Sequence, residues 1–271
     1  MINKTQLLFL ILLNVTHFRC QSVEQTIQKM AIDCSDFSTS DPKLYAALKN
    51  YKFICVGEMH GTKEPAEFLT YLAKTFVSNN RSVIVGFEIS DHLMENFNKQ
   101  RDSVGLLKTK FFSNTSDDGR GSEAWFNAIN DCNKLGVTFC FFDAVSEQRD
   151  LGMFEKLLAC YQADSNSVIL TLSGNIHNKL IPFNNSKTIG YYLQQRFGAQ
   201  VCAINHIYNG GTMYTKTSDG LKVHTLDPKN GVFSTATAYK SYYLPNLFNM
   251  ADYSAFFYTR LVTASLPKNH K

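Results

Sequence analysis

The sequence has no run of basic residues, no Cys-x-x-Cys pair and no apolar stretch long enough to span a bilayer. Its Lys and Arg residues are scattered and the net charge is only +4, so nothing indicates a nucleic-acid partner. Without Cys-x-x-Cys, a zinc ribbon or a thioredoxin-like site is not expected. Charged residues amount to 18% and apolar residues to 44%, which is ordinary globular composition and excludes wholesale disorder.

The chain also has no internal repeat and no obvious linker. Its 271 residues are ample for one domain with a substantial core. We therefore expect a single α/β domain over residues 22–271, preceded by an export signal over residues 1–21.

The expected export signal depends on a short apolar run, Leu7–Leu13. The run is too short to cross a bilayer and has the length of a signal-peptide core, with a buried first helix as the alternative. Residues 16–22 lack a small-x-small cleavage pattern, so we place the cut only near residues 20–22. A lipid anchor at Cys20 is disfavoured by Arg19 directly before it. We predict a secreted or periplasmic protein that associates with a membrane only if Cys20 carries a lipid anchor.

Six cysteines remain after the predicted cleavage, and six cysteines allow fifteen pairings. Cys55, Cys140 and Cys202 lie in expected core strands, where they are predicted to be small buried thiols. The full set is Cys34, Cys55, Cys132, Cys140, Cys160 and Cys202.

Apolar strand-like runs alternate with helical stretches along most of the chain. This alternation predicts a mostly parallel sheet with helices on both faces. After it, residues 210–226 predict a C-terminal hairpin with a turn at Ser218–Gly220, and residues 253–264 one more strand. The expected strands are 51–57, 82–88, 136–144, 167–174 and 199–208; the expected helices are 64–78, 91–100, 122–134, 147–162 and 187–197; residues 102–120 are expected as a polar excursion.

Polar side chains follow the carboxyl ends of these five strands, which is where open parallel sheets bind ligands. Each one alone could be a helix cap or a satisfied buried group. Five consecutive strands with such an ending instead favour one shared site. The residues are Glu58 and His60, Glu88, Asp143 with Arg149 and Asp150 after it, Asn175 and His177, and His206.

A Gly-x-x-His pattern occurs at two of these strand ends, Gly57–His60 and Gly174–His177. The pattern is weak by itself, but glycine at a strand end lets the backbone turn and lets a substrate approach. We therefore predict that His60 and His177 share one pocket although they lie far apart in the chain.

Several motifs together resemble the erythromycin esterase-like, ChaN-like and Tiki superfamily. The stretches are VGEMHGTKEPAEFL, VIVGFEIS, QRDLGMFEKL and VILTLSGNIHN, in this order over residues 50–207. The spacing from Glu58 to His60 is one residue tighter than in the esterases, as in the ChaN-like and Tiki branches. Gly174 stands where the esterases usually have a further histidine.

The esterase resemblance implies that His60 activates water and that Glu88, Arg149 and His177 complete the catalytic group. Glu58 and Glu64 belong to the first motif and are implied to orient it. A histidine beside a carboxylate suits a general base, and an arginine suits an oxyanion.

The Tiki resemblance implies a different use of the same residues, because His60, His177, Glu58 and Glu88 could bind Mn²⁺ or Zn²⁺ and activate water there.

The ChaN-like resemblance implies a third outcome, haem binding without turnover, for which the aromatic stretch 239–248 is the candidate surface. The chain lacks the large helical insertions of the macrolide esterases, so a macrolide substrate is not expected. We predict a hydrolase for an ester or related acyl bond in a small molecule or peptide.

Overall fold

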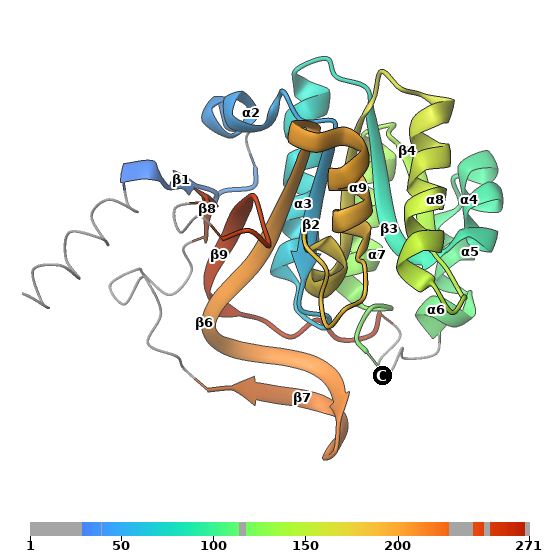
Figure 1. The fold of residues 1–271 in the computed structure, drawn as a ribbon. Helices are drawn as coiled ribbons and strands as arrows, with labels where there is room; N and C mark the ends of the chain where they lie inside the picture. Colours follow the sequence, from blue (N-terminus) through green and yellow to red (C-terminus); the bar gives the residue numbers. More distant parts are fainter. Residues whose placement is uncertain (1–28, 39, 114–117, 228–240, 247–249, 269–271) are drawn as a thin grey trace, which may run out of the picture.

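The computed structural model describes residues 29–38, 40–113, 118–227, 241–246 and 250–268. These residues form one nine-stranded sheet flanked by helices (Figure 1). From one edge to the other the strands are β1 (Ile32–Asp33), β8 (Ser241–Pro245), β9 (Ala255–Val262), β6 (Val201–Thr217), β2 (Phe53–Glu58), β5 (Val168–Gly174), β3 (Val83–Ser90) and β4 (Thr138–Asp143), with β7 (Gly220–Leu226) paired to β6.

The sheet is mostly parallel, as predicted. Five strand pairs are parallel, namely β2 with β5 and β6, β3 with β4 and β5, and β6 with β9. The antiparallel pairs lie at the β1–β8–β9 end and in the β6–β7 hairpin. Every residue of β2 and β5 is buried, which is why these strands read as continuous apolar runs.

Helices cover both faces of the sheet. Ile54 and Val56 of β2 belong to the core beneath helices α3 (Glu64–Ser78) and α7 (Glu123–Lys134). Phe53 and Cys55 face the core beneath helices α8 (Arg149–Ala163) and α9 (Ile189–Phe197). This alternation follows from the two-residue period of a strand. The helices are α2 (Pro42–Leu48), α3 (Glu64–Ser78), α4 (Met94–Gln100), α5 (Ser103–Leu107), α6 (Lys110–Ser113), α7 (Glu123–Lys134), α8 (Arg149–Ala163) and α9 (Ile189–Phe197), with 3-10 turns η1 (Asp91–Leu93), η2 (Asn175–Asn178) and η3 (Gly198–Gln200).

Three expectations differ from the structure. The polar excursion 102–120 contains α5 and α6, and the elements β1, α2 and β8 were not predicted at all. The fifth strand does not end at residue 208, because β6 continues to Thr217 and forms the first arm of the hairpin. The hairpin itself is confirmed, with Gly220 at φ +97° after the turn.

One disulfide joins β4 to α8 through Cys140 and Cys160. The prediction that Cys140 is a free buried thiol is therefore wrong, whereas Cys34, Cys55, Cys132 and Cys202 are free and buried.

The predicted export signal lies outside the described residues. Among the residues that are described, no helix is long and apolar enough to cross a membrane.

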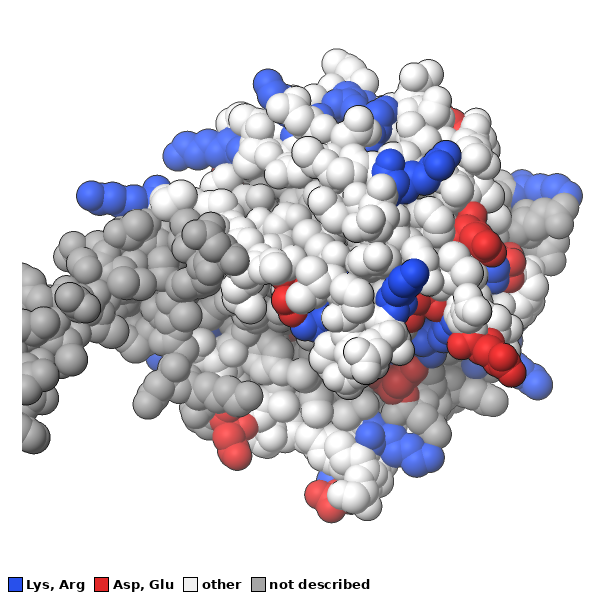
Figure 2. Space-filling model, viewed as in Figure 1, with Lys and Arg blue, Asp and Glu red and all other residues white. Residues whose placement is uncertain are grey.

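Charged side chains are dispersed over the face shown in Figure 2. Lys and Arg mostly stand singly there, and acidic and basic side chains lie next to each other toward its lower right. A single-sign stripe like that of a nucleic-acid-binding groove is not visible on this face.

Candidate active site

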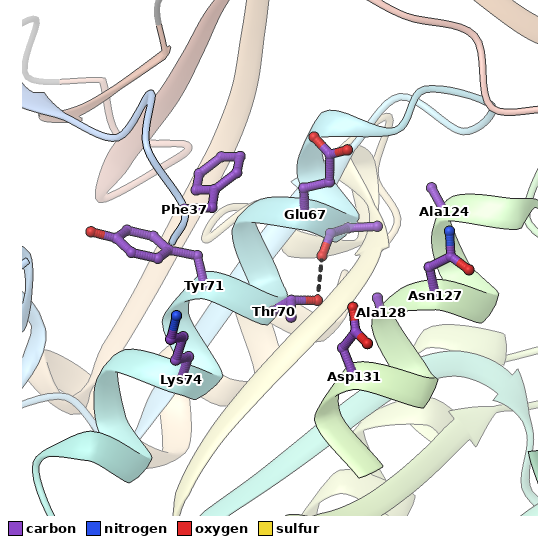
Figure 3. Close-up of a pocket in the computed structure, with 10 residues that line it drawn as sticks. Phe37, Glu67, Thr70, Tyr71, Lys74, Ala124, Asn127, Ala128 and Asp131 are labelled. Carbon is purple, nitrogen blue, oxygen red and sulfur yellow. Dashed lines mark hydrogen bonds between the residues drawn. The ribbon is translucent and has the colours of Figure 1, made fainter. Parts of the chain in front are cut away.

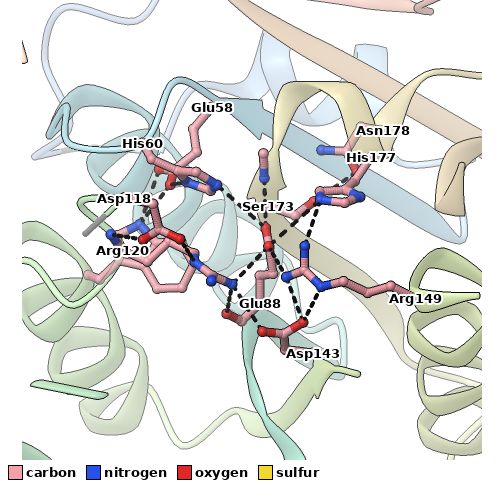
Figure 4. A network of polar contacts seen from close by, with 12 residues as sticks. Glu58, His60, Glu88, Asp118, Arg120, Asp143, Arg149, Ser173, His177 and Asn178 are labelled. Atoms are coloured by element: carbon pink, nitrogen blue, oxygen red, sulfur yellow. Dashed lines mark hydrogen bonds and ion pairs between the residues drawn. The ribbon is translucent and has the colours of Figure 1, made fainter. Parts of the chain in front are cut away.

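The carboxyl ends of β2, β5, β3 and β4 meet at one edge of the sheet, and their polar side chains form a single network (Figure 4). Glu88, at the end of β3, lies at its centre and is 1% exposed. Its Oε1 accepts hydrogen bonds from Arg149 Nη2 at 2.7 Å and Arg120 Nη1 at 2.9 Å. Its Oε2 accepts one from the backbone N–H of Gly174 at 2.9 Å.

Asp143 is the second carboxylate that holds the two arginines. Its Oδ1 accepts from Arg149 Nε at 2.9 Å and Nη2 at 2.7 Å, and its Oδ2 accepts from Arg120 Nη1 at 3.0 Å. Both guanidinium groups are therefore fixed between Glu88 and Asp143, which restricts their orientation in the way that charge-assisted bonds do.

His60 lies beyond the end of β2 and is oriented by Glu58. Its Nδ1 is 2.6 Å from Glu58 Oε1, and Glu58 is almost completely buried. The second contact of this carboxylate is the indole N–H of Trp125, at 3.1 Å from each oxygen. Because an ionised carboxylate only accepts, Nδ1 carries the proton in neutral His60. Nε2 is then an unprotonated acceptor, 3.9 Å from Glu88 Oε2.

His177, in η2, has a matching arrangement. Its Nδ1 is 2.8 Å from Asp150 Oδ1, and its Nε2 is 3.3 Å from Arg149 Nη1. Arginine only donates, so Nε2 of His177 is also the acceptor nitrogen. Asp150 additionally accepts from the N–H of Ile189 at the start of α9, which ties the histidine to two helices.

The two histidine rings lie on either side of Gly174, at the end of β5. A Cβ on Gly174 would lie 3.1 Å from His60 Nε2 and 3.4 Å from His177 Cδ2. A side chain at this position would therefore crowd the space between the rings. The side chains of His60 and His177 are 22% and 19% exposed, so solvent reaches both rings.

Burial and neighbouring charges shift the pKa values of this network. For His60, burial opposes the charged ring, but the carboxylates of Glu58 and Glu88 outweigh it and raise its pKa. For Glu88, burial alone would raise the pKa, but the surrounding cationic groups, His60 and Arg120 foremost, hold it below the usual range. Burial dominates at Glu58 and raises its pKa.

Glu64 and His206 were predicted for the site but lie outside this network. For Asn175, also predicted, the recorded contact is its backbone oxygen, which accepts from Tyr253 Oη at 3.0 Å. Glu64, at the start of α3, is buried and accepts from the backbone N–H of Thr263 at 2.8 Å, so it ties α3 to the segment after β9. His206 was expected at a strand end but lies inside the long strand β6. Its ring is buried against Phe257 and bonds Thr259 Oγ1 at 3.2 Å. Burial lowers the pKa of His206 to about 3, so this ring is neutral.

The sequence did not predict three network residues, Asp118, Arg120 and Trp125. Asp118 Oδ2 accepts a hydrogen bond from Arg120 Nε at 2.8 Å. Arg120 lies at the end of the expected loop, and Gly119 before it has φ +84°. A Cβ on Gly119 would lie 2.7 Å from the Cα of Gly61, so this turn packs directly on the first motif. Trp125 reaches the network from the first turn of α7. Two features of the sequence could have pointed to the last two of these residues: Arg120 stands between two glycines, and Trp125 is the single tryptophan of the chain.

The predicted metal ligands do not fit a divalent ion in this arrangement. Both oxygens of Glu58 are engaged by Trp125, and those of Glu88 by two arginines and a backbone N–H. Two guanidinium groups within 3 Å of Glu88 also oppose a cation at that carboxylate. Within the described residues, no three or more His, Cys, Asp and Glu side chains are grouped so that they could hold a metal.

A separate groove of about 330 Å³ lies between α3 and α7 (Figure 3). Its polar lining includes Glu67, Thr70, Lys74, Asn127 and Asp131. None of the predicted site residues contributes to it. The histidines and arginines therefore mark the sheet edge, and not this groove, as the candidate active site.

The fold and this edge cluster define an α/β protein with a charged site at the carboxyl ends of parallel strands. No protein-family model matches the sequence, and no curated protein sequence matches it significantly. A Bacillus cereus protein of known structure aligns with 93% of this chain and 99% of its own, at a TM-score of 0.72 and 9% identity.

Two further solved structures are similar. A succinoglycan biosynthesis protein aligns with 92% of this chain and 98% of its own, at a TM-score of 0.60 and 11% identity. The erythromycin esterase EreC, in its open conformation, aligns with 81% of this chain and 93% of its own, at a TM-score of 0.50 and 10% identity. The motif-based resemblance to the esterases is thus confirmed for the fold.

Proposed function

We propose that this protein is a hydrolase that cleaves an ester or related acyl bond with water activated by His60. One observation carries the proposal: Glu58 holds Nδ1 of His60 at 2.6 Å, so that the basic Nε2 faces the space shared with His177. A buried carboxylate that fixes the tautomer and supports the imidazolium is what a general base requires. The fold shared with an erythromycin esterase supports the same reaction class.

The proposed reaction uses only side chains of the network. Water attacks the acyl carbon while His60 Nε2 takes its proton, and Glu58 and Glu88 stabilise the resulting imidazolium. When the tetrahedral intermediate collapses, the leaving alkoxide takes that proton back from His60. The products are a carboxylic acid and an alcohol.

Arg149 is the proposed oxyanion partner. It is 34% exposed, the most exposed of the two arginines and two histidines in the network. Its contact with His177 Nε2, at 3.3 Å, is longer than its contacts with Glu88 and Asp143. The N–H at Nη1 is therefore the one most readily redirected to an oxyanion, while the other contacts keep the guanidinium in place.

A panel of small esters and peptides tests the proposal. We expect hydrolysis of at least one ester, and a rate at least about 10²-fold lower for a His60→Ala variant. Titration with haemin in parallel tests the alternative: a Soret band without hydrolysis of any substrate would replace the hydrolase with a haem-binding protein. Of the aromatic stretch predicted for haem, the described part is mostly β8, where Tyr243 and Leu244 are buried in the core.

Chelation should leave the reaction unchanged. The carboxylate oxygens of Glu58 and Glu88 are occupied by N–H donors, so we expect no loss of rate after dialysis against EDTA. The measurement compares initial rates before and after chelation, and after addition of Mn²⁺ or Zn²⁺. Loss of activity with EDTA and recovery with either ion would contradict the base mechanism and support a metal-bound water.

We further propose that the protein is exported. The apolar run Leu7–Leu13 supports this, and so does the disulfide between Cys140 and Cys160, because disulfides persist in oxidising compartments. Native protein should therefore begin near residue 21 and be recovered outside the cytoplasm. N-terminal sequencing that finds intact Met1 on the native protein would contradict export by cleavage.

A further inference from the structure

We propose that Trp125 is a positioning residue, whose indole N–H fixes the Glu58 carboxylate and through it the tautomer of His60. This inference extends the proposed function to a residue outside the strand ends. Part of its test measures no turnover, so it can fail or succeed independently of the hydrolase assignment.

The geometry of the indole carries the proposal. Trp125 is completely buried, and its Nε1 lies 3.1 Å from both oxygens of Glu58, so one N–H is shared between them. A buried indole N–H and a buried carboxylate each require a partner, and here they supply one another. In the part of the chain that the structure describes, Trp125 and His60 are the two side chains seen to donate to Glu58.

Packing fixes the plane of the indole. The rings of Phe87 and Phe111 lie 5.6 Å and 6.0 Å from it, measured between centroids. The start of α7 is also fixed, because Glu123 N donates to Leu266 O and Ala124 N donates to Ser265 Oγ. The tryptophan therefore approaches Glu58 from a fixed part of α7, on the face of the sheet that α3 and α7 cover.

The chemical consequence concerns the proton shared by Glu58 and His60. A hydrogen bond from Trp125 stabilises the ionised carboxylate most when His60 is neutral, since no imidazolium then compensates the charge. Without the indole N–H, the pair would take up its proton at higher pH. A smaller fraction of His60 would then be neutral at pH 7 and available as a base.

The single tryptophan provides a direct measurement, since Trp125 is the only source of indole emission in the chain. Its ring centroid is 6.4 Å from that of His60, close enough for a protonated imidazole to quench its emission. We expect the emission of the wild type to fall as the pH is lowered through the titration of the pair. We expect this transition to disappear in His60→Ala. An unchanged transition in that variant would overturn the proposal.

The second measurement is the pH profile of kcat/KM for Trp125→Phe, which keeps an aromatic ring and loses the N–H. We expect its acid limb to move upward by about one pH unit, because charge-assisted hydrogen bonds have that strength. The matched control is Phe111→Leu, which loosens packing on the same indole and keeps the N–H. We expect a lower Tm in the control and an acid limb at the wild-type pH.

The outcomes separate the role of Trp125 from its contribution to packing. A uniform loss of kcat/KM in Trp125→Phe with an unmoved limb would show a purely structural role and refute the inference. If no ester is cleaved, the titration of the His60 ring is followed by NMR in the wild type and in Trp125→Phe, or in Trp125→Leu if the first variant does not fold. An unmoved titration of His60 in the variant would refute the inference. Failure of the proposed hydrolase function would therefore be seen in the substrate panel, and failure of the proposed role of Trp125 in the titration.

Discussion

Replacement of His60 by alanine is expected to lower kcat/KM for a cleaved ester by about 10²–10⁴-fold, the range typical of a lost general base. The fold should persist, because the ring lies beyond the end of β2 and is partly exposed, so its loss leaves little core cavity. Glu58 keeps its bond from Trp125 in the variant. The measurements are steady-state kinetics and thermal unfolding on the same preparation.

The matched control is His92→Ala, since His92 is exposed and bonds Ser90 Oγ at 2.7 Å outside the network. It should retain wild-type kcat/KM. Added imidazole should restore part of the rate of His60→Ala, because removal of the ring leaves room beside Gly174 for a small base. Full turnover by His60→Ala on a substrate that the wild type cleaves would refute the assignment of His60 as the base.

The strand ends of this site could be predicted because buried parallel strands have a simple sequence pattern. β2 and β3 are apolar up to Glu58 and Glu88, and β5 is interrupted only by the small polar residues Thr171 and Ser173. The ionisable residues at the end of each run therefore mark the sheet edge. His60, Glu88 and His177 were found in this way. His206 was misplaced for the same reason, because β6 continues for 17 residues and its polar residues do not mark its end.

Arg120 and Trp125 could not be predicted from strand ends, since neither follows a strand. Each reaches the site because tertiary packing brings a distant segment to the sheet edge. The turn at Gly119 packs on Gly61, and α7 packs on α3. Glu64 shows the converse: its place in the first motif implied a catalytic role, but it lies at the start of α3 and bonds the chain after β9. Local sequence does not encode such contacts between distant segments.

Replacement of Glu88 by glutamine should have the largest combined effect on stability and activity. Glu88 is the buried anion between Arg120 and Arg149, with Oε1 at 2.9 Å and 2.7 Å from them. Removal of one partner from a buried ion-pair network typically costs about 3–5 kcal/mol, because the opposite charges remain buried. Asp143 still contacts both arginines, so we expect about 3 kcal/mol here.

The activity of Glu88→Gln should fall by about 10²-fold or more, the cost of small misplacements in a catalytic group. The amide cannot balance two guanidinium groups, so Arg149 should move toward Asp143 and lose its place beside His177. The control is Glu155→Gln, the same change at an exposed position on α8, which should alter the free energy of unfolding by less than about 0.5 kcal/mol.

The pH dependence of stability provides the sharpest test of Glu88. Its pKa in the folded protein is lowered from 4.5, so the unfolded state binds its proton first as the pH falls. The stabilisation by Glu88 is therefore fully present above about pH 4.5 and is lost as the pH falls through the folded pKa. Glu58 shifts in the opposite direction, mainly through burial, and this part is the same in both proteins and cancels in their difference. Urea unfolding of wild type and Glu88→Gln should thus differ most above about pH 4.5, and the difference should shrink as the pH falls below it. A difference that is constant over this range would show that Glu88 does not act as a buried anion.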